Sequence, residues 1–122
     1  MYAQEILDYV ESQTSLTIGT DLFLGNLKDG VDEGVVIFDS AGQENDTGML
    51  RFLVGINSVA RDYYTARVNC VLAFTPLAYS NGFTVDSRKF FNTTVMSNPA
   101  YIGLNEKGYS MFSASIIAYT EV

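Results

Sequence analysis

The side chains that could carry chemistry in this chain are carboxylates and a single thiol. None of its 122 residues is a histidine, so a Ser-His-Asp triad, a Cys-His pair and most transition-metal sites are excluded. The sequence "SAGQENDTG" at 40–48 resembles a phosphate-binding loop only in its glycines, because no Lys follows them. Chemistry based on carboxylates is the remaining possibility.

The carboxylates concentrate in two groups around an apolar segment at 35–40. The groups are Asp29, Asp32 and Glu33 before the segment, and Asp39, Glu44 and Asp46 from its end onward. Oxygen ligands at this density could hold Ca²⁺ or Mg²⁺, but their spacing does not match the twelve-residue calcium loop. A paired-carboxylate hydrolase needs one acid in an apolar pocket, whereas most of these acids have Gly, Ser or Asn neighbours. We therefore expect no enzyme, no metal and no cofactor.

Three titratable groups lie in or beside apolar stretches. Cys70 belongs to "RVNCVLAF", where we expect a buried free thiol because no histidine is present to stabilise a thiolate. A single cysteine also excludes an internal disulfide. Asp21 and Asp39 adjoin apolar strands, and carboxylates in such positions usually cap the ends of backbone elements.

Charge is distributed unevenly along the chain. Residues 1–50 contain ten acids and one Lys and carry −9, whereas residues 51–122 contain four acids and six Lys or Arg and carry +2. The resulting −7 argues against wrapping nucleic acid, which requires Lys and Arg to displace phosphate counterions. It is compatible with a surface that DNA slides past without binding.

Composition indicates a globular protein of one domain, 1–122. Hydrophobic residues make up 48% of the chain, with eight Phe and eight Tyr, enough for a core and suited to an interface. No basic segment followed by an apolar run opens the chain, so we expect no signal peptide. No apolar run approaches the roughly 20 residues that span a bilayer, so we expect no membrane contact.

Hydrophobic periodicity predicts two helices. The first covers 2–12, where the apolar residues fall on one stripe at helical spacing. The second is expected to begin with Ser58 as its cap and to run to about Phe74, with Pro76 ending it.

Strands are predicted between and after these helices. They cover 20–27, 35–40, 49–57, 87–97 and 108–122, with loops at 41–48 and 79–83. The sequence "NEKG" at 105–108 is typical of a tight turn with Gly108 in a left-handed conformation. The expected fold class is α+β, a single mixed or antiparallel sheet of about five strands with two helices packed on it and a long C-terminal hairpin. The half-polar last strands could be ordinary sheet edges or surfaces for pairing with a neighbouring subunit.

Three stretches together resemble a family of bacteriophage proteins. They are "GTDLFLGNL" at 19–27, "GVVIFDSAG" at 34–42 and "NPAYIGLNEKGYSMFSASIIAY" at 98–119. In this order they resemble the minor capsid and tail terminator family of long-tailed phages, of the lambda-like fold. Matching positions in the last stretch are Pro99, Gly103, Asn105, Glu106 and Gly108, with Asn105 where the family usually has Asp.

The resemblance implies a structural virion protein at the head-proximal end of the tail. The family forms a hexameric ring that caps the tail tube, stops its elongation and joins the tail to the head connector. The implied partners are further copies of the chain, the tail tube protein and a head-completion protein, with genomic DNA passing through without specific binding. Assembly in the host cytoplasm is expected. The alternatives are a head-completion or neck protein, and a small acidic module that binds a basic partner.

Two sets of residues follow from this interpretation. The acidic set is expected at a subunit or tube interface or along the channel, with a solvated outer loop as the alternative: Asp29, Asp32, Glu33, Glu44 and Asp46. Like charge along a channel wall would keep phosphates from adhering. The second set, Pro99, Gly103 and Gly108, is expected to form structural turns.

Overall fold

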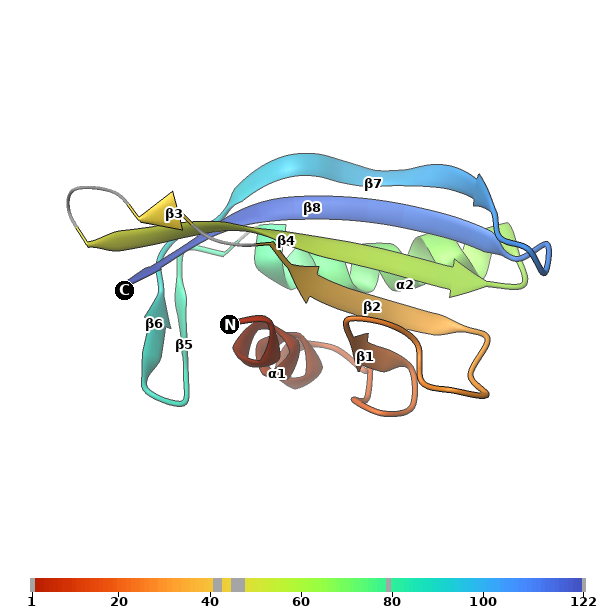
Figure 1. Ribbon diagram of the computed structural model, residues 1–122, viewed down its shortest axis with the longest axis horizontal. Helices are drawn as coiled ribbons and strands as arrows, with labels where there is room; N and C mark the ends of the chain where they lie inside the picture. The colour runs from red at the N-terminus through yellow and green to blue at the C-terminus, as the bar shows by residue number, and fades with distance from the viewer. Residues whose placement is uncertain (1, 41–42, 45–47, 79, 122) are drawn as a thin grey trace.

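A computed structural model of the chain describes residues 2–40, 43–44, 48–78 and 80–121. Its helices pack inside a curled mixed sheet (Figure 1). The helices are α1, Ala3–Gln13, and α2, Tyr63–Ala78. The strands are β1, Leu22–Leu24; β2, Gly34–Asp39; β3, Gln43–Glu44; β4, Met49–Ala60; β5, Phe83–Val85; β6, Arg88–Phe90; β7, Thr94–Leu104; and β8, Ser110–Glu121. The expected α+β class is confirmed.

The sheet is built around the long antiparallel pair of β4 and β8. From β4 it continues through β2 to β1, which runs parallel to β2, and β3 also pairs with β4. On its other side β8 pairs with β7 along most of its length and with β6 near its end, and β5 follows β6. The described residues thus form eight strands rather than about five. The strands β3, β5 and β6 have two or three residues each, too few for a periodic sequence pattern.

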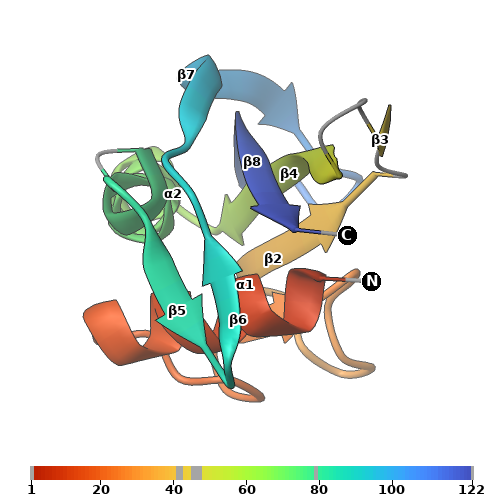
Figure 2. The same ribbon diagram turned by 90° about the vertical axis from the view of Figure 1, so that its left-hand side faces the viewer.

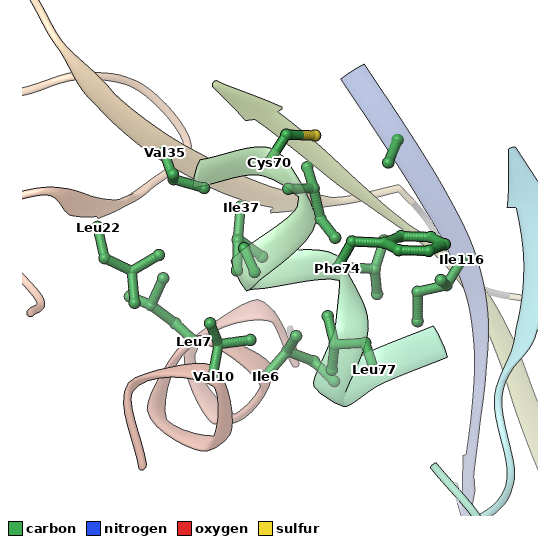
Figure 3. Close-up of a cluster of buried hydrophobic side chains, with 14 of the residues drawn as sticks. Ile6, Leu7, Val10, Leu22, Val35, Ile37, Cys70, Phe74, Leu77 and Ile116 are labelled. Carbon is green, nitrogen blue, oxygen red and sulfur yellow. The ribbon is translucent and has the colours of Figure 1, made fainter. Parts of the chain in front are cut away.

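Helix α1 confirms the amphipathic pattern expected for 2–12. Ile6, Leu7 and Val10 are buried, and Figure 3 shows them facing side chains of β1, β2 and α2. The N-terminal end of α1 is held by Asp39, whose Oδ2 accepts hydrogen bonds from the backbone N–H groups of Tyr2 and Ala3, both at 3.1 Å. A carboxylate in this position satisfies otherwise unpaired N–H groups and complements the helix dipole.

Helix α2 differs from its prediction at both ends. Ser58 lies within β4, and its buried hydroxyl donates to the carbonyl of Ala66 at 2.6 Å, so it is not the helix cap. The cap is Asp62, whose Oδ2 accepts from the N–H of Thr65 at 2.9 Å. Pro76 lies inside the helix, which continues to Ala78. The expectation that Pro76 ends the helix is therefore wrong by two residues.

The predicted strands also differ in length from those observed. The segment expected as one strand at 87–97 is divided between β6 and β7, and Asp86 and Ser87 turn the chain between β5 and β6 with φ of 48° and 72°. The strand expected at 20–27 is limited to β1, and the one at 49–57 extends to Ala60. For β8 the alternation of buried and half-buried residues is confirmed.

The core lies between the helices and the inner face of the sheet. Figure 3 shows Phe74 of α2 beside Ile116 of β8, and Leu77 of α2 beside Ile6 of α1. Cys70 is fully buried, and burial raises the pKa of its thiol to about 11. The expected buried free thiol is confirmed, and at neutral pH it is protonated.

Candidate functional site

The two faces of the sheet have different surroundings. In β8 the inward residues Phe112, Ala114 and Ile116 are buried against α2 and the core. Figure 2 shows α2 inside the curl formed by β2, β4, β8 and β7. Within the described residues, no helix packs on the outer face. Its side chains come from three neighbouring strands: Val36 and Phe38; Leu53, Asn57 and Val59; and Met111, Ser113, Ser115, Ile117 and Tyr119.

Strand β7 is an open edge with large apolar side chains in solvent. It pairs only with β8 among the described strands. Met96, Ile102 and Leu104 are 56%, 53% and 60% exposed. None of its eleven residues is charged, although charged side chains are a common means of protecting a sheet edge. An uncharged apolar edge of this length is typical of the centre of a protein interface.

Exposed aromatic rings extend this edge onto α2. The ring of Tyr63 lies 5.2 Å from that of Tyr101 and 5.0 Å from that of Phe112, measured between centroids. Tyr63 and Tyr64, at the start of α2, are 52% and 71% exposed. We call these exposed side chains of β7 and the start of α2 the β7–α2 surface; it consists of Tyr63, Tyr64, Met96, Tyr101, Ile102 and Leu104.

The backbone of β7 is irregular. Its register against β8 shifts between Val95 and Ser97, between Ser97 and Ala100, and between Tyr101 and Gly103. Pro99 and Gly103, which were expected in turns, lie within this strand, so that expectation is wrong for both. Gly103 has φ of 109°, which suits a bulge, and Pro has no N–H to offer a further strand. The edge is therefore poorly suited to a long main-chain ladder.

The turn after β7 is formed by residues 105–108. Gly108 has φ of 80°, and its N–H donates to the carbonyl of Asn105 at 2.9 Å. The side-chain Oδ1 of Asn105 accepts from the N–H groups of Lys107 and Tyr109, both at 3.0 Å. The side chain of Asn105 therefore organises this turn.

The first acidic group lies against this turn. Asp32 forms an ion pair with Lys107, and the hydrogen bond from the ammonium to this carboxylate raises the pKa of Lys107. Glu33 Oε1 accepts from the N–H of Arg61 at 2.7 Å. Asp29 is exposed in the loop between β1 and β2. Two of these three carboxylates thus hold parts of the chain together.

The second acidic group is not assembled into a site. Asp46 and the side chain of Glu44 lie outside the described residues. Asp39 is occupied at the start of α1, which it caps. Asp21 Oδ1 accepts from the N–H of Thr17 at 2.6 Å and so closes the turn before β1. Within the described residues, no three acidic or cysteine side chains are placed to hold a metal ion.

An apolar pocket lies at the edge of the sheet formed by β1 and β2, opposite the edge formed by β7. Strand β1 ends at Leu24, whereas β2 continues to Asp39, so the edge of β2 is open beyond β1. The pocket there has a volume of about 360 Å³ and is lined by Ala3, Gln4, Leu24, Gly25, Phe38 and Asp39. Leu24 and Phe38 are 44% and 37% exposed.

Sequence reasoning did not find the β7–α2 surface or this pocket. The segment "AYIGL" at 100–104 is apolar and Phe38 is a large apolar residue. Residues of these types are usually found in a protein core. Their exposure follows from the strand order, which leaves β7 and the end of β2 at open edges. The one signal in the sequence was the absence of charge from 94–104.

Comparison with known proteins gives one family. A family model described as bacteriophage tail terminator protein matches residues 9–122. No curated protein matches the chain. Among the described helices, none is long and apolar enough to cross a membrane.

Proposed function

The chain belongs to the bacteriophage tail terminator family, and from this premise we propose that it forms a ring of six copies that caps the tail tube. Membership makes the chain a structural protein of the phage tail. In the proposed role, the ring binds the last layer of tail tube protein, stops its elongation and presents its other side to a head-completion protein.

The observation that carries the ring is the β7–α2 surface. A monomer that exposes an uncharged edge with Met96, Ile102 and Leu104 in solvent is prone to associate. In a closed ring of identical subunits each such edge is covered by the next copy, and association stops at a fixed size. A cyclic arrangement also leaves a central passage for DNA.

We further propose that the acidic loop containing Asp29, Asp32 and Glu33 faces that passage. The chain carries −7 overall, and residues 1–50 hold ten of its acids. Negative charge along the wall repels phosphates, so DNA can pass without binding. The ion pair of Asp32 with Lys107 fixes the loop on the β7–β8 turn, which supports a defined position for its charges.

The decisive experiment is electron microscopy of particles assembled without this protein. Tails of abnormal and variable length are expected, because nothing then ends the polymerisation of the tube. DNA-filled heads beside tails of normal length would instead make the chain a head-completion or neck protein. Normal virions would show that the chain is needed for neither step, and would favour the alternative of a small acidic module that binds a basic partner.

Complementation connects this phenotype to the β7–α2 surface. Ile102→Asp places a charge at a half-exposed edge position, so we expect it to fold but not to restore normal tail length. Thr84→Asp, which adds the same charge at an exposed position of β5, is the matched control and should restore it. If Ile102→Asp restores normal tail length, β7 is not part of the interface.

A further inference from the structure

The β7–α2 surface and the apolar pocket lie on opposite sides of the molecule. The strand order places β1 and β2 at one side of the sheet, and β7 beyond β8 at the other. In Figure 1, β7 runs along the upper side, whereas α1 and β1 lie along the lower side. One copy therefore cannot bring its own two surfaces together, but two copies can do so in the same orientation.

The pocket is shaped to receive an apolar side chain. Phe38 is one of its lining residues, and its ring is held over Gly55 of β4: a Cβ added to this glycine would lie 2.1 Å from the Cζ atom. Leu24 and Gly25 form another wall, and α1 supplies Ala3. With about 360 Å³ available, the pocket admits a side chain such as Ile, Leu or Met, all of which β7 exposes.

The helices on the two sides differ in charge, apart from the Asp62 cap at the start of α2 and Arg88, which lies over the ring of Tyr2 beside α1. Helix α1, next to the pocket, contains Glu5, Asp8 and Glu11 and no basic residue. Helix α2 contains Arg67 as its only charged residue, and β7 contains none. If two copies met through their pockets, the carboxylates of both α1 helices would come together. If the pocket of one copy meets the β7–α2 surface of the next, Arg67 comes towards these carboxylates. Such complementarity selects orientation more than it adds affinity.

The irregularity of β7 determines how it can bind. Three register shifts and Pro99 interrupt its outer edge, so a continuous ladder with a neighbouring strand is disfavoured. The side chains at the shifts remain accessible, and Ile102, between Tyr101 and Gly103, is one of them. Binding through inserted side chains fits this geometry.

We propose that neighbouring copies bind head to tail, with apolar side chains of β7 from one copy inserted into the pocket between Leu24 and Phe38 of the next. The occupant of the pocket is thus a second copy of this chain. A contact between two different surfaces repeats from copy to copy and can close into a ring. The inference rests on the proposed ring and adds which surfaces form it.

Site-specific photo-cross-linking on assembled tails tests this pairing. A photoreactive amino acid replaces Ile102 in unlabelled protein, which is mixed with ¹⁵N-labelled wild-type protein before assembly. We expect adducts between position 102 and labelled peptides that contain Leu24 or Phe38. The same amino acid at Thr84, exposed on β5, is the control and should not label those peptides.

Other adducts overturn the proposal. Cross-links from position 102 to β7 of another copy would show a symmetric contact, and cross-links to a different tail protein would show that β7 binds that protein. Absence of any adduct in assembled tails would also refute it. A second measurement uses labelled neighbours with Leu24→Asp, for which we expect at least a several-fold lower adduct yield; an unchanged yield excludes the pocket.

These outcomes are separable from failure of the proposed function. If tails keep their normal length without the protein, the role in termination is wrong whatever the cross-links show. If tail length depends on the protein but position 102 labels other peptides, the role stands and only the pairing of surfaces is wrong.

Discussion

Asp39 connects three features of the molecule through one carboxylate. It ends β2, it accepts hydrogen bonds from Tyr2 and Ala3 at the start of α1, and it borders the apolar pocket. A residue 36 positions away in sequence thus caps the helix. Its loss would leave N–H groups of the first turn unpaired, so the position of α1 against β2 depends on it.

We predict that Asp39→Ala destabilises the protein by about 0.5–2 kcal/mol, the usual cost of removing a side-chain cap. Asp39→Asn keeps one acceptor and should lose less. Urea unfolding followed by circular dichroism gives both values. Equal stability of the wild type and Asp39→Ala would show that the carboxylate does not support α1.

A second prediction at this scale concerns Gly108. Its φ of 80° is unfavourable for a β-branched residue. Beyond its chain neighbours, a Cβ added at this glycine would meet no atom within 4 Å, so the cost is one of backbone strain alone. Gly108→Val should destabilise by about 1–3 kcal/mol. Asn tolerates this conformation, so Gly108→Asn should lie close to wild type in thermal unfolding. Indistinguishable melting of both variants would contradict the strain.

The residue types alone predicted a capping role for Asp39 and a buried thiol at Cys70, but they did not show that the helix capped by Asp39 lies 36 positions away. They failed for Ser58 and Pro76. Ser58 is a preferred helix cap, but the alternation of β4 extends through it and buries it. Which of two competing local signals prevails depends on the partner strand, β8, more than 50 residues later.

At the scale of elements, the start of α2 is held by Asp62. Its carboxylate accepts hydrogen bonds from the backbone N–H and the hydroxyl of Thr65. These bonds favour the ionised form and lower the pKa of Asp62 below its usual 3.8. A lowered folded-state pKa means that the stabilisation is present above pH 3.8 and is lost as the pH falls further.

This gives a pH-dependent prediction for α2. Asp62→Ala should melt at a lower temperature than wild type at neutral pH, and the difference should shrink as the pH falls below the usual pKa of about 3.8 for an aspartate. Thermal scans of both proteins between neutral pH and about pH 3 measure it. A difference that stays constant or grows towards acid pH would exclude the charged cap.

The edges of the sheet were the part of the fold that sequence patterns could not supply. The alternation in β8 predicted which of its residues face the core, since a strand with one buried face has a period of two. β7 shows no such alternation, because most of its residues are exposed whichever way they point. The candidate interface is therefore a consequence of strand order, which depends on long-range pairing.

At the scale of the whole molecule, net charge opposes the assembly that the apolar surfaces favour. Copies that each carry −7 repel one another at long range, whereas the contact proposed between β7 and the pocket is largely apolar. Salt screens the repulsion, with a Debye length of about 10 Å at 0.1 M. We predict that ring formation, measured by analytical ultracentrifugation, increases with salt at constant protein concentration. Dissociation by salt would indicate that ion pairs dominate the interface.

The last prediction concerns the path of DNA. Asp29 is the acidic loop residue to test, because replacing Asp32 or Glu33 would also break contacts with Lys107 or Arg61. Asp29→Lys should leave folding and tail length unchanged, since surface changes usually alter stability by less than about 0.5 kcal/mol. If the loop lines the passage, a lysine from every subunit creates a ring of positive charge that holds phosphates, and DNA delivery slows. The readout is the rate of DNA ejection from purified virions, with Asp29→Asn as the control for simple loss of charge. Ejection of Asp29→Lys virions at the wild-type rate would place the loop on the outer surface, where its acids serve only solubility.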